Sequence, residues 1–165
     1  MKSWEGTMTP DIEHQTGPKS KDAVVGTHRI VAGIDGSDAS LGALRWAADQ
    51  AEGTHATLEV VMSWHWPFAY DITPLLHESD PVSESRKVFE SAMADIRREY
   101  PCLDIASRFE HGHPAKILID ASRGADLLVV GSRGHGEFSG MVLGSVSQHC
   151  AHKAACPVLI HREAE

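Results

Sequence analysis

Three short glycine-containing segments hold the residues best suited to chemistry in this sequence. They are Gly-Ile-Asp-Gly-Ser at 33–37, Gly-Ser-Arg-Gly at 131–134 and, after nine further residues, Gly-Ser at 144–145. Glycine lets a backbone approach a ligand closely and adopts positive φ without strain. The last segment precedes an expected helix, whose N-terminus would present unpaired N–H groups and a partial positive charge. These segments predict a cradle for an anion, above all for phosphate oxygens.

Polar side chains within these segments would complete the cradle. Ser145 can cap the expected helix or donate its hydroxyl to a phosphate. Arg133 can offset part of a ligand's negative charge, although it is also an ordinary residue for an exposed loop. Asp35 is followed by Gly36, a pair that favours turns, so a contact with a ligand and a purely local turn both stay open.

Alternating strands and helices must position these segments. Short apolar, β-branched runs predict strands, and amphipathic stretches predict helices. The strands are expected at 28–34, 56–64, 104–110, 125–131 and 156–162, and the helices at 40–51, 82–100, 113–124 and 145–154. The first helix is expected to end at Gly53 and the third at Gly124, because glycine commonly terminates helices.

This alternation predicts a doubly wound, Rossmann-like α/β fold. Strand–helix–strand units cross over right-handed and build a parallel sheet covered on both faces. The run at 125–131 is apolar on both faces, which suits such a sheet. We expect five parallel strands in the order 3-2-1-4-5, with the switch point between strands one and four. Ligands of these sheets bind beyond the strand C-termini at that point, where segments 33–37 and 131–134 fall.

The spacing Gly-x-x-Gly, nine residues, Gly-Ser resembles the ATP-binding signature of the universal stress protein family. The resemblance continues in IVAGIDGSDASLGALRWA at 30–47, GHPAKILIDASRGADLLVVGSRG at 112–134 and GSVSQHCAHKAACPVLIHR at 144–162. One glycine pattern is weak evidence, whereas three blocks in the same order are strong. We expect a single domain over 28–162. Residues 1–27 lie outside the resemblance and, as an untethered terminus, are expected to form a mobile arm.

The resemblance implies a site for an adenine nucleotide at the edge of the sheet, with ATP as the first candidate. Asp35 would lie near the ribose or the phosphates, where it would also hold Mg²⁺ if a metal is bound. Val61 would contact adenine through its backbone at the end of the second strand. The residues expected around the nucleotide are Gly33, Ile34, Asp35, Gly36, Ser40, Val61, Gly131, Arg133, Gly134, Gly144, Ser145 and Val146.

Three functions are compatible with such a site. The first is a nucleotide-dependent regulatory protein of a stress response, without dedicated catalytic residues beyond weak ATP hydrolysis. No P-loop lysine motif occurs, and no Ser-His-Asp or Cys-His set is suggested by position. The second is a slow ATPase or phosphotransferase, since phosphoryl transfer requires mainly positioning and charge neutralisation. The third is a nucleotide-free dimeric scaffold, whose glycine loop is only a linker. The resemblance further implies a homodimer through the strand at 156–162, beside an unidentified protein partner.

Composition excludes several other classes. Fifteen basic and 23 acidic residues give a net charge of −8, and an acidic surface repels nucleic acid and anionic lipid. No run reaches the roughly 20 apolar residues of a membrane span, and no signal peptide is recognisable. Three cysteines at irregular spacing make no disulfide framework, so we expect a cytoplasmic protein. The group His149, Cys150, His152 and Cys156 lacks the convergent spacing of metal motifs.

Overall fold

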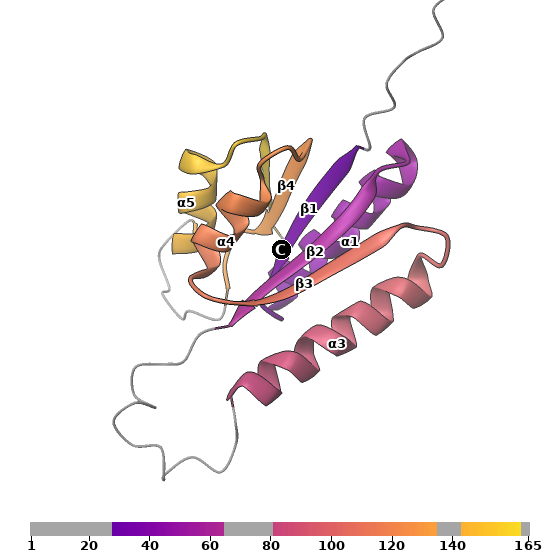
Figure 1. Cartoon of the computed structure of the whole chain (residues 1–165), viewed down its shortest axis with the longest axis horizontal. Coiled ribbons are helices and arrows are strands. Elements are labelled where there is room, and N and C mark those ends of the chain that lie inside the picture. Colours follow the sequence, from indigo (N-terminus) through magenta and orange to yellow (C-terminus); the bar gives the residue numbers. More distant parts are fainter. Residues whose placement is uncertain (1–27, 65–80, 135–142, 163–165) are drawn as a thin grey trace, which may run out of the picture.

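The computed structural model describes residues 28–64, 81–134 and 143–162. Within them the elements are β1 (Arg29–Ile34), α1 (Asp38–Thr54), β2 (Thr57–Trp64), α3 (Pro81–Glu99), β3 (Ile105–His111), α4 (Pro114–Ala121), β4 (Leu127–Gly131), α5 (Ser145–Lys153) and β5 (Val158–His161). Figure 1 shows their arrangement. The expected arm at 1–27 lies outside the described residues.

The five strands form one parallel sheet in the order β3-β2-β1-β4-β5. This confirms the predicted fold class and strand order. β1 lies at the centre, where Gly33 pairs with Val61 of β2 on one side and with Val130 of β4 on the other. The direction of winding reverses between β1 and β4, so the switch point lies where the sequence predicted it.

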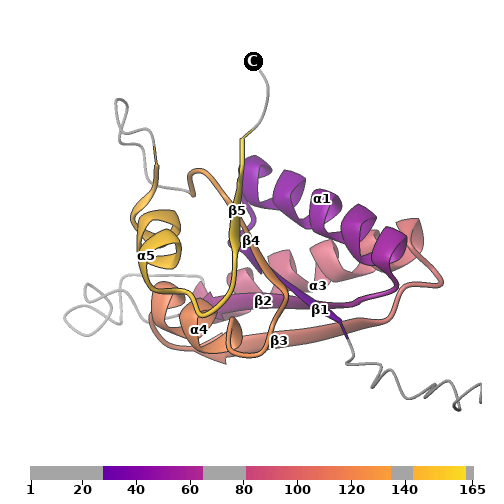
Figure 2. The same cartoon turned by 90° about the horizontal axis from the view of Figure 1, so that it is seen from above.

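Helices cover both faces of the sheet. α1 and α3 lie on one face and α4 and α5 on the other, as the view in Figure 2 shows. None of the helices in the described ranges is long and apolar enough to cross a lipid bilayer.

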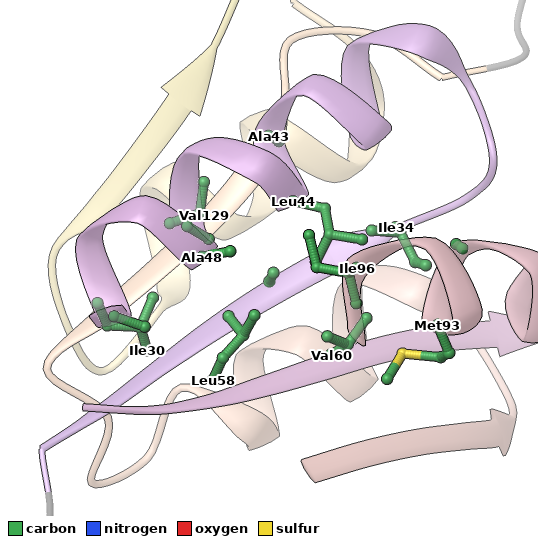
Figure 3. Close-up of a cluster of buried hydrophobic side chains, with 14 of the residues drawn as sticks. Ile30, Ile34, Ala43, Leu44, Ala48, Leu58, Val60, Met93, Ile96 and Val129 are labelled. Carbon is green, nitrogen blue, oxygen red and sulfur yellow. The ribbon is translucent and has the colours of Figure 1, made fainter. Parts of the chain in front are cut away.

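Small side chains let α1 approach the sheet closely. Its buried face is made mainly of alanines, among them Ala43, Ala47 and Ala48, while α3 contributes larger side chains. Figure 3 shows this core, in which α1 and α3 face the strand residues Ile30, Ile34, Leu58, Val60 and Val129. A second core fills the opposite face, between the sheet and α4 and α5.

Two helix ends differ from the prediction. α1 continues through Gly53 to Thr54, and His55 then adopts the left-handed conformation at φ 55°. The His55 N–H donates to the carbonyls of Ala51 and Glu52, so a non-glycine residue closes the helix. α4 ends at Ala121, before Gly124, which has the positive φ of 70° that suits glycine but lies outside the helix.

A buried carboxylate ties three strands together. Glu59 of β2 is only 6% exposed and forms ion pairs with Arg29 of β1 and Arg108 of β3. Arg29 also donates to the carbonyls of Ala121 and Arg123, at and just beyond the end of α4. A buried charge is tolerated when it is paired in this way.

Candidate functional site

A cavity of about 490 Å³ opens at the C-terminal edge of the sheet, at the switch point. We call it the switch-point cavity. Its walls come from the ends of β1, β2 and β4 and from the first turns of α4 and α5. All the predicted contact residues except Gly36 line it. Sequence reasoning missed six further lining residues, which are Ser63, Pro114, Leu118, Val130, Leu143 and Ser147.

The loop after β1 is held by its own side chains. Gly36 has φ 88° and makes the turn. The Asp35 carboxylate accepts hydrogen bonds from the Ser37 backbone N–H at 3.0 Å and the Ser37 hydroxyl at 2.6 Å. The Ser37 hydroxyl oxygen in turn accepts from the N–H of Ser40 and caps α1, whose first turn also carries Asp38. Asp35 therefore both builds the turn and lines the cavity.

Ser40 has a local task as well. It is 3% exposed, and its hydroxyl donates to the Ser37 carbonyl at 2.8 Å and accepts from the Asp35 N–H at 3.2 Å. These bonds fix the loop on which Asp35 stands.

Three of the four cavity glycines lie in close contact with other parts of the protein, Gly131 against backbone and Gly33 and Gly134 against the ends of side chains. A Cβ at Gly131 would lie 2.9 Å from the backbone of Ala39, at the start of α1. A Cβ at Gly33 would lie 2.8 Å from the Leu118 methyl groups, and one at Gly134 would overlap the carboxylate of Asp35.

Gly144 is different. A Cβ there would meet its nearest neighbour, the Cα of Arg133, at 3.6 Å, which is ordinary van der Waals contact. Its φ of −71° is open to any residue. Within the described residues, packing therefore gives no reason for glycine at this position, whereas the close approach of a ligand would.

The N-terminus of α5 is open toward the cavity. Gly144, and not Ser145, is the N-cap residue; no side chain of the described residues caps the helix, and its first turn holds no acid. The first N–H to bond within the helix is that of Gln148, which donates to the Gly144 carbonyl at 3.0 Å. The amides of Ser145, Val146 and Ser147 precede that bond and have no partner within the helix. α1 differs, since the Ser37 hydroxyl caps its N-terminus and the acidic Asp38 lies in its first turn.

The two ends of the cavity differ in polarity. On the α4 side the walls are mainly apolar, with Val61, Pro114 and Leu118 beside the hydroxyl-bearing Ser63. On the α5 side, glycine backbone, two serines and the exposed Arg133 line the cavity together with the apolar Leu143 and Val146.

β2 extends beyond its central neighbour. β1 ends opposite Met62, whereas β2 continues beside β3 to Trp64. Val61, predicted at the strand end, lies inside the sheet between Gly33 and Arg108. Ser63 has a neighbouring strand on one side only, which a sequence without known strand ends does not reveal.

No cluster of three or more potential metal ligands occurs in the part of the chain that the structure describes. Two of the three cysteines, Cys150 and Cys156, are also unsuited to reaction. Cys150 is fully buried, and this burial raises the pKa of its thiol to about 11. Burial raises the pKa of the Cys156 thiol as well. Thiols with raised pKa values are poor nucleophiles and metal ligands at neutral pH.

Comparison with known proteins places this geometry in a family. The family model described as "Universal stress protein family" matches residues 26–162. A universal stress protein of Mycolicibacterium smegmatis is 35% identical over 134 residues, which are 81% of this chain and 45% of that protein. The chain spans about half the length of the curated relatives it matches.

Solved structures agree with this result. UspA from Lactobacillus plantarum has the same fold, with a TM-score of 0.70 and 21% identity over 82% of this chain and 98% of that one. A universal stress protein solved in complex with cAMP gives a TM-score of 0.59 and 29% identity, over 81% of this chain and 95% of that one. The chain belongs to the universal stress protein family.

Proposed function

We propose that the protein binds an adenine nucleotide in the switch-point cavity, with ATP as the first candidate. It would act as a nucleotide-dependent regulatory protein of a stress response. One observation carries the proposal. Among the described residues, no side chain caps the N-terminus of α5, which opens on the cavity, and no packing contact requires Gly144 to lack a side chain. Free amides at a helix N-terminus are a good site for phosphate oxygens.

The nucleotide would cross the sheet edge from β2 to β4. Its phosphates lie at α5, its ribose beside Asp35, and its base on the apolar α4 side between Val61 and Leu118. The backbone of Ser63, beyond the end of β1, is better placed than that of Val61 to bond the edge of adenine. Two strand spacings of about 4.8 Å give roughly 10 Å between base and phosphate, which suits a nucleotide.

The charge of the residues that line the cavity limits how many phosphate groups the bound nucleotide can carry without a metal ion. Among the described residues that line the cavity, Arg133 and Asp35 are the only charged ones. A triphosphate therefore needs Mg²⁺ to offset its charge, and Asp35 would be the protein's contribution to a metal held mainly by phosphates and water. A cyclic monophosphate carries one negative charge and needs no metal, which makes cAMP a second candidate, supported by the related structure that holds it.

The test is calorimetric titration with ATP and Mg²⁺, ATP alone, and cAMP, on the wild-type protein and on Gly144→Val. We expect wild-type binding in the micromolar range and a loss of at least tenfold in Gly144→Val, because the valine fills the space that the phosphates approach. Gly53→Val is the matched control, since a Cβ at Gly53 meets no atom within 4 Å and lies away from the cavity.

Several outcomes would change the proposal. Wild-type affinity in Gly144→Val would show that the cradle is assigned wrongly. ATP turnover above background that Asp35→Ala abolishes would make the protein an ATPase. Tighter binding of cAMP than of ATP with Mg²⁺ would name the cyclic nucleotide as the ligand.

The proposed regulatory form is a homodimer in the cytoplasm, built from the single domain at 28–162. β5 is an edge strand with β4 on one side, and its residues, Val158 and Ile160 among them, are only partly buried. Unpaired edges of this kind readily pair with a second chain. Light scattering should give the mass of a dimer whose stability changes when nucleotide is added. A dimer indifferent to ATP, in a protein that binds none, would favour the scaffold function.

A further inference from the structure

Ser147 joins the start of α5 to the end of β4. It is the third residue of the helix and is 4% exposed. Its hydroxyl donates to the Gly131 carbonyl at 2.7 Å and lies 3.5 Å from the Ser132 carbonyl. A backbone bond from the Gly144 N–H to the Ser132 carbonyl, at 2.8 Å, lies beside it. The backbone bond would form with most residues at these positions, whereas the hydroxyl bond to the Gly131 carbonyl depends on the side chain of Ser147.

The acceptor of that hydroxyl is itself fixed. Gly131 is packed so closely against Ala39 and Ser40 of α1 that no side chain fits between them. The chain of contacts therefore runs from the N-terminus of α1, through Gly131, to the first turn of α5. It sets how far the free amides of that turn stand from Arg133 and Gly134, across the phosphate end of the cavity.

We propose that the side chain of Ser147 is a positioning residue for phosphate recognition. This inference rests on the proposed function. The hydroxyl acts through Gly131, holding the amides of Ser145 and Val146 at the distance that phosphate oxygens require. Binding groups must be held within about 0.5 Å of their working geometry by such supporting contacts. The base end of the cavity, built by β2 and α4, does not depend on this bond.

The test compares the affinities of adenosine and of the phosphorylated nucleotide that the wild-type protein binds. Their ratio measures what the phosphates contribute. In Ser147→Ala we expect that ratio to fall roughly fivefold to tenfold, as the loss of one buried hydrogen bond implies, while the Kd for adenosine changes less than twofold. Ser147→Thr, which keeps a hydroxyl, should restore most of the ratio.

Ser122→Ala is the matched control. Ser122 is also a fully buried serine, and its hydroxyl donates to the Ile119 carbonyl at 2.7 Å and accepts from the Ala155 N–H at 2.8 Å. It joins the far ends of α4 and α5, away from the cavity. Ser122→Ala should lower the unfolding midpoint as Ser147→Ala does, yet leave unchanged the ratio of the affinities for the nucleotide and for adenosine.

The outcomes separate the two proposals. An unchanged ratio in Ser147→Ala, or an equal fall in Ser122→Ala, would overturn the positioning role and leave nucleotide binding intact. If the wild-type protein binds neither adenosine nor any nucleotide, both proposals fail. Should Ser147→Ala not fold, Ser147→Cys provides the same comparison, because its thiol is only a weak donor.

Discussion

Gly131 and Gly144 belong to one sequence pattern but are glycine for different reasons. Gly131 is enclosed by backbone atoms of α1, which cannot move aside as a flexible side chain can. In the part of the chain that the structure describes, no atom would lie closer than van der Waals distance to a Cβ at Gly144. The pattern in the sequence shows both as equivalent, and only their neighbours in space separate a packing role from a ligand role.

Alanine substitution should separate the two roles. Gly131→Ala forces backbone apart and should lower the free energy of unfolding by about 2 kcal/mol. Gly144→Ala should change it by less than about 0.5 kcal/mol. Urea denaturation of both variants and the wild type measures the difference. If Gly131→Ala were as stable as the wild type, the N-terminus of α1 would have to move away from the added methyl group at little cost.

Cys150 makes the stability of the protein fall in alkali. Its thiol has a pKa of about 11 in the fold, raised by burial from the ordinary value of 9.0. The folded state thus holds the proton more tightly than the unfolded chain. The protonated thiol therefore adds its full stabilisation below pH 9. As the pH rises toward 11, the free energy of unfolding falls by about 2 kcal/mol.

Denaturation between pH 8 and pH 11 tests this. Cys150→Ala should flatten the decline, whereas Cys102→Ala, at an exposed position, should leave it as in the wild type. An equally steep decline in Cys150→Ala would assign it to other groups. Tyr100 is one such group, since burial and its bond to Asp49 raise its pKa.

At the scale of elements, the sequence predicted which segments are helices and strands and where β1, β2 and β4 end, but not where α1 and α4 end. Periodicity is a property of ten or more residues, whereas an end depends on one or two contacts. α1 ends at His55 because that residue, and not Gly53, takes the left-handed conformation. β2 ends at Trp64, as predicted, but its register with β1 was not predictable, so Val61 was expected at the strand end although it lies beside Gly33 inside the sheet.

Glu59 illustrates the same limit. A carboxylate in the middle of a buried strand contradicts the apolar pattern around it. Its partners, Arg29 and Arg108, come from the two neighbouring strands, 30 and 49 residues away in sequence. Only the order and register of the sheet bring the three together, so the sequence alone did not identify them as a group.

At the scale of the whole molecule, the strand order was predictable, and so was the edge of the sheet at which the cavity opens. Alternating elements and right-handed crossovers leave few topologies, and the glycine segments follow the two strands at the switch point. The depth of the cavity and its α4 wall were not predictable. Pro114 and Leu118 line it because α4 packs across the ends of β1 and β2, a matter of helix placement rather than of motif.

The cavity draws its walls from both halves of the chain, β1 and β2 from the first and α4, β4 and α5 from the second. Neither half can form it alone. A ligand held there binds only the fully folded domain, so its binding free energy adds to the folding of the whole and not to that of one segment. Affinity for the proposed nucleotide would thereby report on the integrity of the whole domain. A substitution that loosens a distant contact, such as that of Tyr100 with Asp49, weakens binding to the extent that it depopulates the native state.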